Sequence, residues 1–122
     1  MIYLSAYNST TGDLAFAAVK DTEAAIPWEV VDGLPEGTPD DMTPGAKRLG
    51  FTEAGPDVGR YTSLAIGSSG QIVIAYQDVS NNAVKLAILP SVAERKWSVS
   101  TIAAPEAGAR LGMFTQLTLD GS

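Results

Sequence analysis

A repeated pattern of strands and turns is the feature that most constrains this chain. Residues 60–88 read RYTSLAIGSSGQIVIAYQDVSNNAVKLAI. Runs of β-branched and aromatic residues bounded by Gly, Asn, Asp and Ser are typical of β-hairpins. The pattern therefore predicts three short strands over 62–66, 71–77 and 83–89, joined by two polar turns.

The same unit occurs a second time near the N-terminus. Ile72–Gln77 matches Tyr3–Asn8 at an offset of 69, and the two tryptophans, Trp28 and Trp97, are separated by the same offset. Agreement between a strand match and the tryptophan spacing favours a true internal repeat over chance similarity.

The first strand of this second unit is absent before Met1 and is found at the other end of the chain. Residues 114–122 match residues 61–69 at an offset of 53. The two offsets together equal the chain length of 122 residues, so joining the ends would give two complete repeats. The sequence thus predicts a two-repeat cycle that is opened inside a hairpin turn.

Repeats of four short antiparallel strands at this period favour an all-β fold, a β-propeller built from four-stranded blades. A small antiparallel sandwich or meander is the alternative. We expect one two-blade unit over 1–122. Its parts are blade 1 (113–122 together with 1–34), a long loop (35–59), blade 2 (60–102) and a connector (103–112).

One repeat also resembles a known group of proteins. The segments Tyr61–Ala65, Ile74–Asp78 and Leu86-Ala87, with Gly70 in the turn, are similar to the blade repeats of large bacterial β-propeller proteins. The other repeat follows this pattern loosely. The resemblance implies a fold and no particular activity, because propellers carry many functions.

Two blades cannot close a ring, since propellers have roughly four to eight blades. We therefore expect the last strand of one chain to complete the first blade of the next chain in a cyclic homo-oligomer. A six-bladed homotrimer is favoured over two or four chains; a fragment of one longer propeller is the other possibility. The residues expected at this closure are Met1, Ile2, Tyr3, Leu4, Phe114, Gln116, Leu117 and Leu119.

Composition argues against catalysis and against several partners. The chain has no His and no Cys, which removes the commonest general base, thiolate nucleophile and metal ligands. Asp40 and Asp41 lie in a Pro/Gly-rich loop and are expected to be solvated. We expect no enzyme, no metal and no cofactor. A net charge of −6 disfavours nucleic acid and anionic membranes as partners.

The remaining functions are a self-assembling scaffold, which we favour, and a binding module. The loops between the second and third strands, and between blades, should share one polar face that contains tyrosines and suits a carbohydrate or a peptide. In architecture, a two-blade subunit closing as a trimer resembles the small fucose-binding propeller lectins of bacteria and fungi, which implies multivalent sugar binding. The candidate ligand-binding residues are Tyr7, Asn8, Asp13, Tyr61, Tyr76, Gln77, Asp78 and Asn81.

Nothing in the sequence indicates a membrane span or a secretory signal. It contains no run of about 18 apolar residues and no charged segment followed by an apolar one at the N-terminus. We expect the chain as written to be cytoplasmic, and extracellular if it was excised from a longer secreted propeller.

Overall fold

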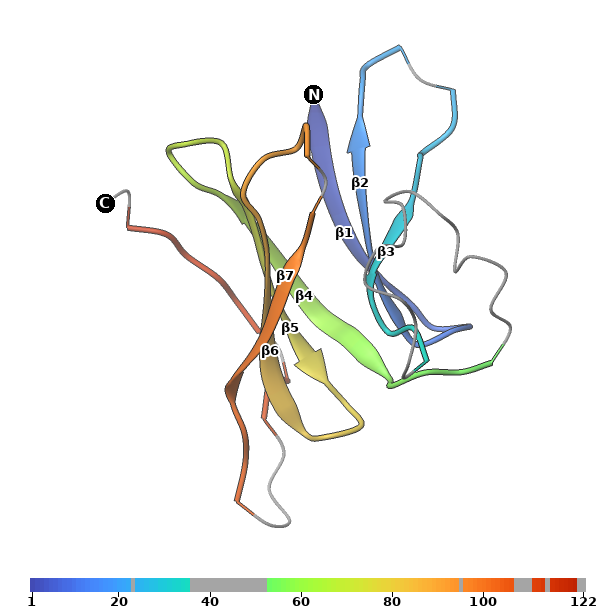
Figure 1. Ribbon diagram of the computed structural model, residues 1–122, viewed down its shortest axis with the longest axis vertical. Coiled ribbons are helices and arrows are strands. Elements are labelled where there is room, and N and C mark those ends of the chain that lie inside the picture. Colours follow the sequence, from blue (N-terminus) through green and yellow to red (C-terminus); the bar gives the residue numbers. More distant parts are fainter. Residues whose placement is uncertain (23, 36–52, 95, 107–110, 114, 121–122) are drawn as a thin grey trace.

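The computed structural model describes residues 1–22, 24–35, 53–94, 96–106, 111–113 and 115–120. Over these ranges the protein is all-β, contains no helix and forms two antiparallel sheets (Figure 1). The expected all-β class is confirmed.

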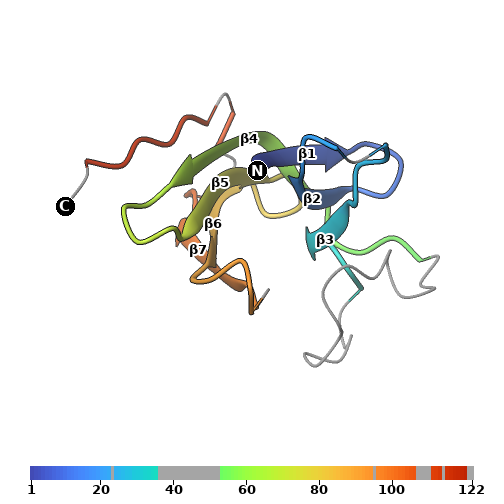
Figure 2. The same cartoon turned by 90° about the horizontal axis from the view of Figure 1, so that it is seen from above.

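The first sheet has three strands in the order β1 (Ile2–Asn8), β2 (Asp13–Val19) and β3 (Glu29–Asp32). The second sheet has four strands in the order β4 (Val58–Ile66), β5 (Ile72–Asp78), β6 (Ala83–Leu89) and β7 (Ser98–Ala103). Each strand pairs with the next along the chain. Figure 2 shows β1 beside β4, with β3 and β7 at the far ends of the two sheets.

β4 begins at Val58, two residues before the expected start of blade 2. The backbone N–H of Val58 donates to the carbonyl of Gly12 at 2.9 Å. A side chain at Gly59 (φ +105°) would lie 2.7 Å from the Cα of Leu14. The turn after β1 therefore fixes the start of β4, and only glycine permits this close approach.

The two sheets are built alike, as the pairing of their strands shows. Ile2 pairs with Val19 in the first sheet, and Ile72 pairs with Leu89 in the second. β1 and β2 therefore correspond to β5 and β6 at an offset of 70. The pairing of β2 with β3 and that of β6 with β7 are each interrupted by a register shift, after Leu14 and after Val84, which are equivalent positions. The two sheets thus have a register shift at the same place along their paired strands.

The offset of 69 derived from the sequence is wrong by one residue for β1 and β5. That match aligned the Ala-Tyr pairs, whereas the ladders make Tyr7 equivalent to Gln77 and not to Tyr76. A slip of one residue moves a side chain to the opposite face of its sheet. β3 and β7 correspond at an offset of 71, so Trp28 and Trp97 are displaced by two residues relative to each other.

The core lies between the two sheets. Phe16 of β2 is buried against a cluster that includes Ile74 and Tyr76 of β5. The ring of Trp97 meets Phe16 edge-on at a centroid distance of 5.0 Å, and Tyr3 stacks on Phe16 at 6.2 Å. Aromatic pairs at these separations stabilise a core beyond the area that they bury.

A polar group joins the sheets at the edge of this core. The carboxylate of Asp32 accepts a hydrogen bond from the Tyr76 hydroxyl at 2.7 Å and forms an ion pair with Nζ of Lys85 at 2.6 Å. Tyr76 is fully buried. We refer to Asp32, Tyr76 and Lys85 as the polar joint.

The described part of the C-terminal segment, residues 115–120, belongs to neither sheet. The N–H of Leu117 donates to Oγ of Ser63 on β4 at 3.0 Å. Phe114, the expected first residue of the last strand, lies outside the described residues.

Replacing Asp32 with Ala is expected to destabilise the fold by about 3 kcal/mol, because Lys85 and the Tyr76 hydroxyl would lose their buried partner. Urea denaturation measures the change. Asp21→Ala, at an exposed position, is the matched control and should change stability by less than about 0.5 kcal/mol. Equal midpoints for the two variants would contradict a structural role for the polar joint.

Candidate functional site

One face of the first sheet is turned away from the second sheet. Side chains alternate along a strand, so the residues of β1 and β2 that do not face the core share this other face. We call it the open face and define it by Ile2, Leu4, Ala6, Ala15, Val19 and Val30. Ile2 is 51% exposed, as expected for an apolar surface that the described part of the chain leaves uncovered.

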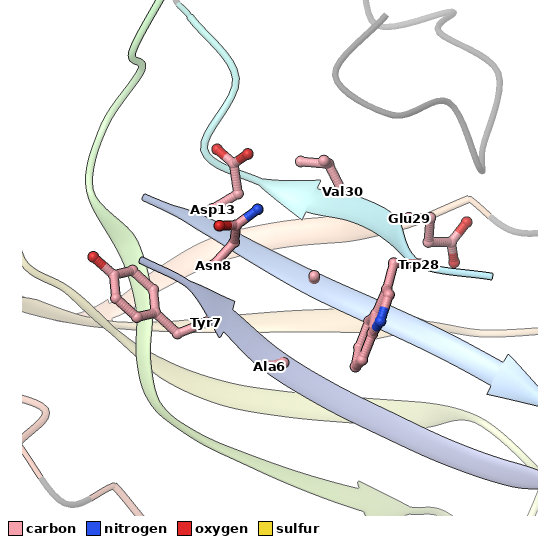
Figure 3. Close-up of a pocket in the computed structure, with 8 residues that line it drawn as sticks. Ala6, Tyr7, Asn8, Asp13, Trp28, Glu29 and Val30 are labelled. Carbon is pink, nitrogen blue, oxygen red and sulfur yellow. The ribbon is translucent and has the colours of Figure 1, made fainter. Parts of the chain in front are cut away.

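A hollow of about 530 Å³ lies on this sheet. The Trp28 ring stands at one end of the hollow, and Asn8 and Asp13 lie together at the other (Figure 3). Ala6 and Ala15, which pair across β1 and β2, form its floor. Tyr7, Glu29 and Val30 complete the lining.

The hollow exists because two alanines stand where the other sheet has large side chains. At the offset of 70, Ala6 corresponds to Tyr76 and Ala15 corresponds to Lys85. In the second sheet these two side chains fill the space and reach Asp32. At the equivalent positions of the first sheet, the methyl groups of Ala6 and Ala15 leave this space unfilled.

The structure brings three of the predicted ligand-binding residues together. Tyr7, Asn8 and Asp13 all line the hollow. The Tyr7 hydroxyl donates to Oδ1 of Asp57 at 2.7 Å, and the Arg60 guanidinium lies 5.2 Å from the centre of the Tyr7 ring. The hydrogen bond with Tyr7 is the largest of the effects that raise the pKa of Arg60.

The other predicted residues lie elsewhere and make contacts within the chain. Tyr76 belongs to the polar joint. Nε2 of Gln77 donates to the carbonyl of Leu111 at 2.9 Å, and Asp78 accepts bonds from both the backbone and the side chain of Asn81. Tyr61 is 36% exposed and has a positive φ of 51°, which is rare for a bulky residue. None of these side chains lines the hollow.

Five lining residues were not predicted from the sequence. For two of them, Ala6 and Ala15, the signal is the contrast with Tyr76 and Lys85 at the equivalent positions of the second sheet. The correspondence of Ala6 with Tyr76 is visible only at the offset of 70, which the sequence match of β1 with β5 missed by one residue. The unpredicted residues are Ala6, Ala15, Trp28, Glu29 and Val30.

The described residues contain no group of three acidic or metal-binding side chains able to hold a metal ion. They also contain no helix of the length and hydrophobicity needed to span a membrane. No protein family, no curated protein and no solved structure matches this chain.

Burial, followed by the charge of Asp32 and the hydrogen bond to it, raises the pKa of Tyr76 far above the ordinary value of 10.0. The Tyr76 hydroxyl should therefore stay protonated in the folded protein when the pH passes through 10. Because only the unfolded state then loses this proton, the contribution of Tyr76 to stability is present below pH 10 and is lost as the pH rises above it.

This shift can be tested by following tyrosinate absorbance in the wild type and in Tyr76→Phe. In the folded state, the two proteins should show the same absorbance change through pH 10. In denaturant, the variant should lose the contribution of one of four tyrosines. A smaller absorbance change for the folded variant would mean that Tyr76 ionises and that the account of its environment is wrong.

Proposed function

We propose that this chain is a non-catalytic subunit of a closed β-propeller, whose C-terminal segment completes the first blade of a neighbouring chain. The observation that carries the proposal is the difference between the two sheets. They share ladder registers and a bulge, but over the described residues the first sheet has no strand that corresponds to β4.

The missing strand has a candidate in residues 115–120. In the second sheet, Ile66 of β4 pairs with Ile72 and Ser63 pairs with Ala75. Applying offsets of 53 and 70 to these pairs predicts the pairing between chains: Leu119 lies opposite Ile2, and Gln116 lies opposite Ser5. This register supplies a partner for the outer edge of β1.

Exposure of apolar residues at both ends supports this pairing. Met1, Ile2 and Leu119 are 59%, 51% and 39% exposed in the single chain. Exposed strand edges beside apolar side chains favour association with another strand. Covering these side chains contributes about 25 cal/mol for each Å² of apolar surface removed from water.

Such an interface joins different surfaces of successive chains, so it must close into a ring to avoid open-ended growth. Two blades per chain permit rings of two, three or four chains within the usual range of propeller sizes. We propose the homotrimer with six blades.

Multivalent carbohydrate binding is the alternative function. The loop residues expected to bind a sugar are largely engaged within the chain: Tyr7 with Asp57, Gln77 with Leu111, and Asp78 with Asn81. Donors and acceptors already paired internally gain less from a sugar hydroxyl. This observation places assembly ahead of sugar recognition.

An engineered disulfide tests the proposed register. The chain has no native Cys, so Ile2→Cys with Leu119→Cys introduces the only thiols. Residues directly opposite in an antiparallel pair have Cα atoms about 4.5–5.5 Å apart, within the range that a disulfide spans. Oxidation should produce covalent species containing up to three chains on a denaturing gel, and reduction should return single chains.

The control pair is Tyr3→Cys with Leu119→Cys, which is shifted by one residue. Its two side chains should point to opposite faces, so it should crosslink far less. A disulfide formed within one chain, or equal crosslinking by both pairs, would overturn the proposed strand exchange.

A further inference from the structure

We propose that the hollow beside Trp28 binds a small neutral phenol, a ligand the size of a tyrosine side chain. The hollow would be covered by the second sheet of a neighbouring copy, and in this respect the proposal rests on the proposed function. Each interface between chains would then hold one such ligand.

The contact inside the chain provides the template. There, the space between the two sheets contains the phenol ring of Tyr76, fully buried, with its hydroxyl bonded to Asp32. The aminobutyl group of Lys85 lies beside it and meets the same carboxylate. Close packing between the two sheets therefore depends on the side chains of Tyr76, Lys85 and Asp32.

The proposed interface between chains has smaller residues at the positions equivalent to Tyr76, Lys85 and Asp32. Ala6 and Ala15 replace Tyr76 and Lys85 on the open face. On the surface that would cover it, Ala103 corresponds to Asp32, because the two residues pair with the equivalent Val84 and Leu14. Leu86 similarly corresponds to Phe16. A sheet seated as in the chain itself would leave the space of the missing phenol unfilled.

The lining determines the class of ligand. Ala6, Ala15 and Val30 are apolar, and the Trp28 ring offers an aromatic wall. Covered by the second sheet of a neighbouring copy, this end of the hollow would be an enclosed apolar cavity, and such cavities stay dry and take up small aromatic molecules. At the other end, Asn8 and Asp13 carry oxygens that accept hydrogen bonds from the Thr10 N–H and the Thr11 hydroxyl within the chain. Because such an oxygen has more than one lone pair, it can also accept a bond from a ligand hydroxyl. A ring with one hydroxyl satisfies both ends.

The test uses p-cresol, which is the tyrosine side chain as a free molecule, with the full-length chain. Titration calorimetry should show saturable binding of one p-cresol per chain. In Trp97→Phe, which leaves Trp28 as the sole indole, the same titration should change the tryptophan emission.

Filling the hollow from the protein side should abolish binding. Ala6→Tyr restores the residue found at the equivalent position of the second sheet, and Ala15→Leu fills the floor by a smaller change that keeps a fold if the first variant does not. Each should weaken p-cresol binding by about tenfold or more. The control is Ala93→Tyr, at an exposed position of the turn between β6 and β7, which should bind p-cresol like the wild type.

Absence of saturable p-cresol binding by an assembled wild type would overturn the proposal, and so would binding by both filled variants with the affinity of the wild type. Neither result would contradict the ring. Failure of the ring is recognised separately, by the disulfide pair. The chain could also fail to exchange strands and still bind p-cresol in a way that Ala6→Tyr abolishes. The hollow would then be a ligand site of the single chain, which supports the ligand and contradicts only the covering sheet.

Discussion

The outer edge of β1 is the constraint on which the rest of this structure depends. Within the described part of the chain, β1 pairs only with β2, so the backbone N–H and C=O groups along its other edge lack a strand partner. An edge of seven residues beside exposed apolar side chains such as Ile2 favours pairing with another strand. The segment that fits this edge in sequence, 115–120, lies next to β4 instead. The proposed strand exchange would bring these features together between different copies.

The contact of the first sheet with the second sheet and its proposed contact with a neighbouring chain differ in chemistry. Toward its own second sheet, it offers the carboxylate of Asp32, which pairs with Tyr76 and Lys85. A buried charge pair of this kind favours one relative position of the two sheets, since a shift would leave a charge unpaired. On the open face, Ala6 and Ala15 offer no polar group. The contact between the two sheets of one chain is thus specified by charge, and the proposed contact between chains by apolar surface.

Much of the fold could be predicted from the sequence. Runs of β-branched residues separated by polar turns predicted strands over 62–66, 71–77 and 83–89, and the structure has them at 58–66, 72–78 and 83–89. The start of β4 was therefore predicted four residues too late. The alignment of β1 with β5 was not predicted correctly. The Ala-Tyr pairs at 6–7 and 75–76 suggested an offset of 69, whereas backbone pairing gives 70. Because side-chain direction reverses at each residue, this small error placed Tyr7 and Tyr76 in equivalent roles that they do not have.

The candidate site was predicted less well for a related reason. Tyr7, Asn8 and Asp13 were found because polar and aromatic residues near turns are conspicuous in a sequence. Ala6 and Ala15 were missed because a small residue carries no chemical signal of its own. Their importance comes from volume that is present in one repeat and absent in the other. Only the paired strands show which positions to compare.

The central claim is that the chain closes a ring with copies of itself, and native mass spectrometry of the untagged protein near neutral pH tests it most directly. The account predicts one dominant species at three times the chain mass of 12.7 kDa. Two or four chains would retain strand exchange and change the number of blades. A compact, soluble monomer that persists when the protein concentration is raised well above that of the first measurement would contradict the account.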